Sequence, residues 1–97
     1  MNIRSHIFEF DWDEGNIGKN KKHRVTDSEC EEAFSDEFKA VSKDILHSSN
    51  EERFILIGKT KQERLLYIIF TMRHNKLRII SARDPNKKER AIYEKIP

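Results

Sequence analysis

The chain has 97 residues, of which 36% are hydrophobic and 37% are charged, so it has material for one thin core and is expected to form a single domain over residues 1–97. It has no apolar run of about 18 residues to cross a membrane, no signal-like N-terminus and only one cysteine, which together predict a cytoplasmic protein without membrane contact. Residues 1–50 hold 7 Lys/Arg against 11 Asp/Glu and residues 51–97 hold 12 against 6, an asymmetry typical of a nucleic-acid partner on one side but also compatible with an ordinary solvated surface.

The first elements are weakly indicated. Residues 7–10 alternate as a short strand, and Asp11 or Asp13 then caps a weak helix over residues 14–22. Two glycines weaken this helix, and its lysines cluster near its C-terminus, where the helix dipole favours cations.

The next helix has a clear start. Thr26 and Glu29 have the spacing of a capping box, flanked by a hydrophobic staple of Val25 and Cys30. Cys30, Ala33 and Phe34 share one helical face, and the helix is expected to end near residues 35–36. Cys30 is therefore expected in the core, not as a nucleophile.

Strands dominate the second half. Residues 38–42 form a weak strand, and residues 44–52 form a polar loop. Three strands, at 54–59, 65–73 and 77–83, are joined by connections short enough for antiparallel hairpins. The middle strand is apolar on both sides, which predicts a sheet covered on both faces.

A helix closes the chain. Asp84 is expected to cap it, with Pro85 at the first helical position, where proline fits. Ile92, Tyr93 and Ile96 give this helix an apolar side. The order of elements predicts an α+β fold.

Arginines on the last two strands are the first candidates for a functional site. If Asn75 lies near the turn centre, Arg78 pairs close to Thr71, and Arg73 and Arg78 project near one another. Arg83 ends its strand beside the lysines of the last helix's first turn, where an anion would be favoured. Solvated charges with a nearby glutamate are the alternative interpretation.

Other chemistries lack a signal in the sequence. There is no Gly-rich phosphate loop, no Cys/His pair at zinc-ligand spacing and no acidic cluster in the strands, so no metal site is predicted. His23 lies in a basic stretch and is either an exposed linker histidine or a group for proton transfer near a phosphate.

Two sets of residues between about Phe8 and Lys95 match one known family. The N-terminal set consists of Phe10-Asp11-Trp12-Asp13, Lys22-His23 with Val25, and Glu32-Ala33-Phe34. The C-terminal set consists of Glu52-Arg53, Ile57-Gly58, Thr71-Met72-Arg73, Arg78-Ile79-Ile80-Ser81-Ala82-Arg83, and Lys88-Glu89-Arg90 with Tyr93. In these features the chain resembles the BrnT toxin family, although Arg24 stands where the family often has glycine, so a different turn is expected there.

The resemblance implies a fold and a function. It implies a RelE-like fold: an antiparallel sheet of three C-terminal strands plus one or two N-terminal strands, packed with two N-terminal helices and one C-terminal helix. It also implies a ribonuclease toxin of a type II toxin–antitoxin system, which stops translation by cutting RNA. The implied partner is a BrnA-like antitoxin, which caps the toxin in a hetero-oligomer and recruits it to promoter DNA, so contact with DNA is only indirect.

RNA cleavage without a metal or other cofactor requires a base, an acid and cations for the developing phosphorane charge. Arg73, Arg78 and Arg83 are the predicted cations and His23 the acid or base, with Tyr67 or Tyr93 as weaker candidates. The predicted RNA-binding residues are Trp12, Lys22, Lys59, Lys87 and Lys88; Trp12 is alternatively a core anchor. A nucleic-acid- or antitoxin-binding module without cleavage activity is the second hypothesis, and a metal-dependent hydrolase the third.

Overall fold

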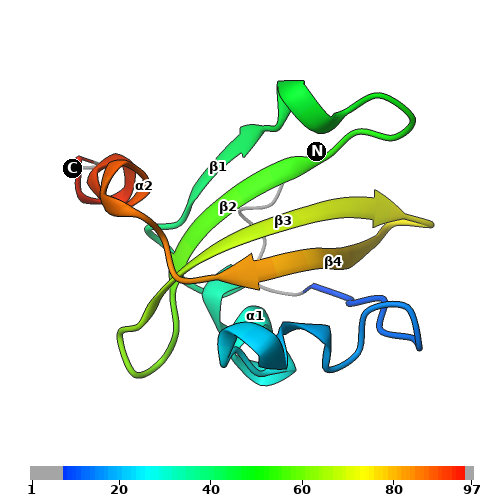
Figure 1. Ribbon diagram of the computed structural model, residues 1–97, viewed down its shortest axis with the longest axis horizontal. Coiled ribbons are helices and arrows are strands. Elements are labelled where there is room, and N and C mark those ends of the chain that lie inside the picture. The colour runs from blue at the N-terminus through cyan, green and yellow to red at the C-terminus, as the bar shows by residue number, and fades with distance from the viewer. Residues whose placement is uncertain (1–7, 96–97) are drawn as a thin grey trace.

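The computed structural model describes residues 8–95 and has the predicted α+β architecture. Its sheet has four antiparallel strands in the order β1 (Ala40–Lys43), β2 (Phe54–Lys59), β3 (Leu65–Arg73) and β4 (Lys76–Arg83). Each strand pairs with the next one in the sequence, so the sheet is a simple meander (Figure 1). The bounds of β2 and β3 are those predicted, and β4 begins one residue earlier than predicted.

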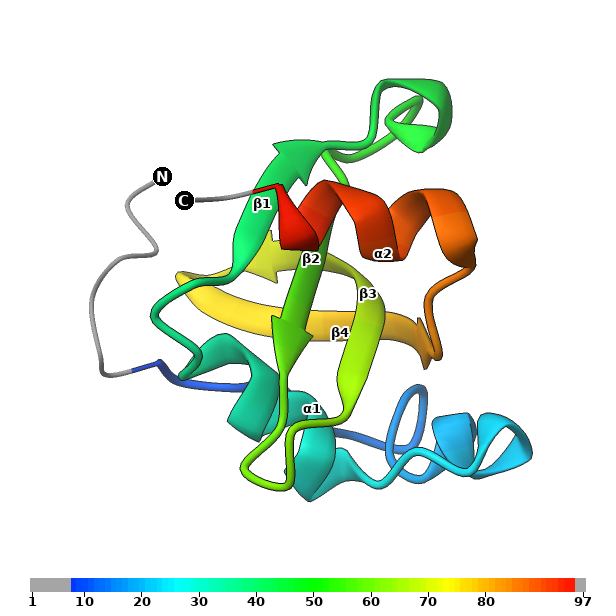
Figure 2. The ribbon, with the colours of Figure 1, turned by 90° about the vertical axis from the view of Figure 1, so that its left-hand side faces the viewer.

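Two α-helices, α1 (Asp27–Phe34) and α2 (Lys87–Glu94), cover opposite faces of the sheet. Two short 3-10 helices, η1 (Lys19–His23) and η2 (Ile45–His47), lie in the connecting segments. Figure 2 shows α2 crossing in front of the sheet while α1 lies beneath it. None of the helices within residues 8–95 is long and apolar enough to cross a membrane.

The capping box predicted for α1 is confirmed. The Thr26 hydroxyl accepts a hydrogen bond from the Glu29 amide at 3.1 Å, and the Thr26 amide donates to Glu29 Oε1 at 2.9 Å. These bonds satisfy two of the groups that a helix start leaves without partners. Val25 and Cys30 are both buried in the core under this helix, as the staple pattern predicts.

Helix α1 lies very close to the sheet. A Cβ atom added at Gly58 would lie 2.5 Å from the Ala33 carbonyl oxygen, so only glycine permits this approach of helix to strand. Phe34 packs edge-on against Phe70, with ring centroids 5.0 Å apart. This core also contains the buried residues Cys30, Ala33, Leu56, Leu66, Ile68, Leu77, Ile79 and Ala82.

Helix α2 covers the other face through Tyr93, which packs with Ile57 and Leu65. The Tyr93 hydroxyl donates to Asp36 Oδ2 at 2.7 Å and so links the helix to the chain that precedes β1. Both faces of β3 are therefore covered, which is the arrangement its apolar sequence predicts. Ile92, expected on the apolar side, is 55% exposed, and Ile96 lies outside the described residues.

The predicted cap of the last helix is wrong. Asn86, not Asp84, is the N-cap. Its side-chain oxygen accepts from the Glu89 backbone amide at 2.8 Å, and its own backbone amide donates to Glu89 Oε1 at 2.8 Å. Asp84 instead accepts a hydrogen bond from Arg64 Nε at 2.9 Å, so its carboxylate is engaged elsewhere. Pro85 consequently precedes the helix.

The predicted N-terminal helix over residues 14–22 is also wrong. The segment forms turns followed by η1, which is flanked by Gly18, with a φ of 67°, and by Arg24, with a φ of 59°. Both values lie in the left-handed region, which interrupts α-helix. Arg24, which stands where the BrnT family often has glycine, therefore adopts a backbone conformation that glycine adopts at lower cost.

Three smaller differences concern the strands. Phe10 forms a single parallel bridge with Leu77, and Ile7 of the predicted strand lies outside the described residues. Strand β1 begins two residues later than the strand predicted over residues 38–42. The predicted loop over 44–52 contains η2.

Candidate functional site

The outer edge of β4 is covered by residues 10–24, which we call the N-terminal segment. The Asn16 side-chain amide donates to the Ile79 carbonyl oxygen at 3.2 Å, and Asn20 Oδ1 accepts from the Ala82 amide at 2.9 Å. Both asparagines are buried, so their side chains replace the backbone partners of a neighbouring strand. The segment therefore runs along β4 and brings His23 to the end of that strand.

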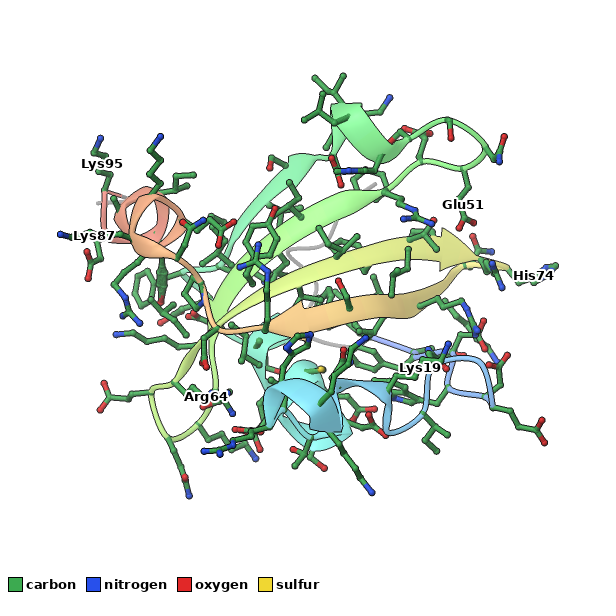
Figure 3. The ribbon with its side chains drawn as sticks, in the orientation of Figure 1. Lys19, Glu51, Arg64, His74, Lys87 and Lys95 are labelled. Atoms are coloured by element: carbon green, nitrogen blue, oxygen red, sulfur yellow. The ribbon has the colours of Figure 1, made fainter. Side chains whose placement is uncertain are left out.

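Arg64, between β2 and β3, joins this segment to the rest of the domain (Figure 3). Its Nη1 donates to the Arg24 carbonyl oxygen at 2.7 Å and to Glu29 Oε2 at 3.2 Å. Its Nε donates to Asp84 Oδ1 at 2.9 Å, and its Nη2 donates to the His23 carbonyl oxygen at 3.4 Å. Hydrogen bonding from Arg64 lowers the pKa of the Asp84 carboxyl. His23 lowers the same pKa by a smaller amount.

Arg83 is held at the same end of β4. Its guanidinium carbon lies 4.2 Å from the centroid of the Tyr67 ring, and its Nη1 and Nη2 donate to the two oxygens of Glu89 at 2.8 and 3.0 Å. Hydrogen bonding from Arg83 lowers the pKa of Glu89. Its Nη1 also donates to the Asp84 carbonyl oxygen at 3.1 Å, and the Arg83 side chain as a whole remains 41% exposed.

A bulge in β4 decides which way its arginines point. Arg78 pairs with Thr71, as predicted, and Arg83 pairs with Tyr67. Thr71 and Tyr67 are four residues apart and share a face of β3, whereas five residues separate the two arginines. The register shift near Ile69 absorbs the extra residue, so both arginines project from one face of the sheet.

Arg78 lies toward the opposite end of β4. Its Nη2 donates to Asp13 Oδ1 at 2.8 Å, its Nη1 lies 3.4 Å from Asp11 Oδ2, and its side chain is only 11% exposed. Arg73 is exposed, with its Nε 3.7 Å from Glu51 Oε2. Arg78 pairs with Thr71, two residues before Arg73 on the same face of β3, so the two arginines project near one another, as predicted. Arg78 first, and Arg73 more weakly, lower the pKa of Asp13.

The four predicted catalytic residues therefore fall into two groups. His23 and Arg83 lie where β4 ends beside α2, and Arg73 and Arg78 lie toward the β3–β4 turn. Five residues of strand separate Arg78 from Arg83, which corresponds to roughly 15 Å. Figure 3 marks the two ends by Lys87 on one side and His74 on the other.

The predicted RNA-binding residues occupy different surroundings. Trp12 is half-buried against the core, stacks on Phe10 and donates from Nε1 to Glu31 Oε2 at 2.7 Å. Lys59 Nζ lies 5.7 Å from the centroid of the Tyr93 ring. The other three are exposed lysines: Lys22 on η1, and Lys87 and Lys88 in the first turn of α2.

The remaining candidates for proton transfer differ in environment. Partial burial, with the charge of Glu89 nearby, raises the pKa of Tyr67. Burial and the hydrogen bond to Asp36 raise the pKa of Tyr93 further, which fits a structural role. Burial also raises the pKa of the Cys30 thiol to about 12, and the residue lies in the core, as predicted.

Sequence reasoning missed Arg64 as part of the site and named Glu89 only as a neighbour of solvated charges, without its pairing to Arg83. The spacing of Asn86 and Glu89 could have signalled the capping box that places the glutamate beside Arg83. No local pattern marks Arg64, whose partners come from three other segments. Among residues 8–95, no group of three or more His, Cys, Asp or Glu side chains is placed to hold a metal ion.

The structure defines a small α+β domain with a four-stranded antiparallel sheet and arginine–carboxylate clusters at both ends of β4. The family model described as "Ribonuclease toxin, BrnT, of type II toxin-antitoxin system" matches residues 12–89. The chain belongs to this family of ribonuclease toxins, which confirms the resemblance seen in the sequence and implies an RNA substrate and an antitoxin partner. A comparison with curated proteins finds no match.

Proposed function

We propose that the protein is a metal-independent endoribonuclease that inhibits translation, and that its reaction centre lies where β4 ends. One observation carries the location: Arg83 is fixed by Tyr67 and Glu89, and the next residue, Asp84, is joined through Arg64 to the segment that bears His23. A guanidinium whose orientation is set before substrate binds does not have to be reorganised during the reaction.

The proposed reaction is an internal phosphoryl transfer. The ribose 2′-oxygen attacks the adjacent phosphorus, the bond to the 5′-oxygen breaks, and the products are a 2′,3′-cyclic phosphate and a 5′-hydroxyl. Arg83 stabilises the charge on the non-bridging oxygens through its exposed side. His23 takes the proton from the 2′-hydroxyl or gives one to the leaving 5′-oxygen, and solvent water exchanges the other of these two protons.

Other cations hold the RNA on either side of the reacting phosphate. Lys22, Lys87 and Lys88 are exposed on the two elements that flank the end of β4 and would contact neighbouring phosphates. Arg73 is exposed and available for a more distant phosphate. Arg78 must first loosen from Asp13 before it can do the same, and Lys59 and Trp12 extend the contact surface.

The proposed partner is a BrnA-like antitoxin that covers the basic face in a hetero-oligomer in the cytoplasm. Covering Arg83 and the first turn of α2 with acidic or hydrogen-bonding groups would block the reacting phosphate directly. Complementary charge of this kind accelerates association, and added salt weakens that effect. Promoter DNA is contacted only through the antitoxin.

The decisive experiment incubates the purified toxin with RNA in EDTA and maps the cleavage ends. We expect cleavage by the wild type, loss of about 10²-fold or more in rate for Arg83→Ala, and partial recovery in Arg83→Lys, because a point charge replaces a two-donor fork. Lys95→Ala, at an exposed position at the end of α2, is the matched control and should cleave normally.

Two results would contradict the proposal and select its alternatives. Retardation of RNA without cleavage would favour a nucleic-acid- or antitoxin-binding module. Cleavage that EDTA abolishes and a divalent cation restores would favour a metal-dependent hydrolase.

A further inference from the structure

We propose that Arg64 is a positioning residue for the reaction, which holds the backbone of His23 and Arg24 against the end of β4. This inference rests on the proposed function, because it assigns Arg64 a role through His23. The residue lies between β2 and β3, and every group that its guanidinium binds is at least 20 residues away in the sequence.

Arg64 satisfies carbonyl groups at a point where regular structure ends. Arg24 follows η1 with a φ of 59°, and the left-handed conformation turns the chain out of the helix. The carbonyl oxygens of His23 and Arg24 both accept from the Arg64 guanidinium, at 3.4 and 2.7 Å. Helix ends need such donors for their last carbonyl groups.

The guanidinium itself is fixed from two sides. Glu29 of α1 accepts from Nη1 at 3.2 Å, and Asp84, next to Arg83 in the chain, accepts from Nε at 2.9 Å. The Arg64 side chain is 27% exposed, and its bond to Glu29 is partly shielded from water, whereas the bond to Asp84 is exposed. A single planar group thus sets the His23 segment in a constant position relative to the end of β4.

The same contacts distinguish Arg64 from a residue that binds the reacting phosphate. Each of its three nitrogens donates to a protein oxygen, whereas Arg83 uses only its two terminal nitrogens and keeps 41% of its side chain exposed. Lysine has no fork that could reach carbonyl and carboxylate groups in several directions at once. The cleavage rate of Arg64→Lys should therefore be little higher than that of Arg64→Met.

The test is a double-mutant cycle between Arg64→Met and His23→Gln, with Arg64→Lys as a second variant that keeps the charge. In the wild-type background Arg64→Met should lower the cleavage rate by about 10²-fold, the loss expected when a reacting group is misplaced by about 1 Å. In the His23→Gln background the same substitution should change the rate by less than about threefold, because coupled residues are not additive. The loss in melting temperature should be similar in both backgrounds, since the contacts of Arg64 are with the His23 backbone.

A second readout does not depend on activity. The imidazole and amide NMR signals of His23 should move in Arg64→Met and in Arg64→Lys, and should stay in place in the control Arg90→Met, at an exposed position of α2. Unmoved His23 signals, or rate losses that multiply across the cycle, would overturn the positioning role. If the wild type cleaves no RNA, the proposed function fails while the NMR result still decides whether Arg64 holds the segment.

Discussion

The contact between Arg83 and Tyr67 gives a direct measure of how firmly the proposed cation is held. The perturbation is a double-mutant cycle in which Tyr67→Leu removes the aromatic face and Arg83→Met removes the charge. Arg83→Met also removes the ion-pair partner of Glu89, but this cost occurs in both backgrounds and cancels in the coupling energy.

The geometry of the pair sets the size of the expected coupling energy. The guanidinium carbon lies 4.2 Å from the ring centroid, well inside the range of a cation–π interaction. Because 41% of the Arg83 side chain is exposed, water screens the contact, and a coupling of about 0.5–1 kcal/mol is expected instead of the larger value of a desolvated pair. Tyr67→Leu alone should cost more, since the ring also packs beside the core formed with Ile57.

The assay is urea denaturation of the wild type, both single variants and the double variant, with Tyr67→Phe as control. Tyr67→Phe keeps the aromatic face and should preserve both the coupling and the cleavage rate, whereas Tyr67→Leu should slow cleavage by loosening Arg83. A coupling energy of zero would refute the idea that the ring orients the guanidinium. A large loss of cleavage in Tyr67→Phe would instead assign the hydroxyl a part in proton transfer.

Three further predictions concern the free energy of unfolding. Gly58→Ala should lower it by about 1–3 kcal/mol in denaturant titrations, because the added Cβ meets the Ala33 carbonyl oxygen at 2.5 Å; an unchanged value would show that α1 can move away. Asn20→Ala should cost about 1–3 kcal/mol, seen as a lower melting temperature, because a buried amide on β4 loses its acceptor; an unaltered melting temperature would mean that water replaces the side chain. Because Arg83 lowers the folded-state pKa of Glu89 below its ordinary value of 4.5, the stability from this pair is present above about pH 4.5 and is lost as pH falls through the lowered value. Unfolding free energies measured against pH should decline less steeply in acid for Glu89→Gln, and equal slopes would contradict the pairing.

Local patterns predicted the meander well, because its pairing partners are close in sequence. The bounds of β2 and β3 follow from alternating and apolar runs separated by short turns, and the pairing of Arg78 with Thr71 follows from the turn at Asn75. The start of α1 was predicted equally well, because the capping box is a pattern within four residues.

Long-range contacts account for what the sequence did not reveal. Asp84 is a good cap by residue type, but Arg64, 20 residues earlier, engages its carboxylate, and the cap passes to Asn86. The weak helix over 14–22 is replaced by turns and η1, in which Asn16 and Asn20 bond to strand atoms about 60 residues away. Tertiary hydrogen bonds of this kind override a weak helical propensity.

The site was predicted by residue type but not by arrangement. Counting by twos from Arg78 places Arg83 on the opposite face of β4, and only the bulge brings the two onto one face. The ion pair of Arg78 with Asp13 spans 65 residues and has no local signal. Charged residues could therefore be named as candidates, while their partners and grouping depend on contacts between segments far apart in the sequence.

The lining of β4 by Asn16 and Asn20 also has a consequence for the order of folding. The meander joins neighbours in the chain and pays little loop-closure entropy, whereas docking residues 10–24 onto β4 closes loops of about 60 residues. Until β4 has formed, the Ala82 amide and Asp84 are not in place to anchor that segment. We therefore expect the nascent toxin to pass through an inert stage in which the sheet exists but His23 is still unattached, so that toxicity begins with the last docking step. Stopped-flow refolding should show this as a slow phase, in which the fluorescence of Trp12 and cleavage activity appear together after the sheet has formed.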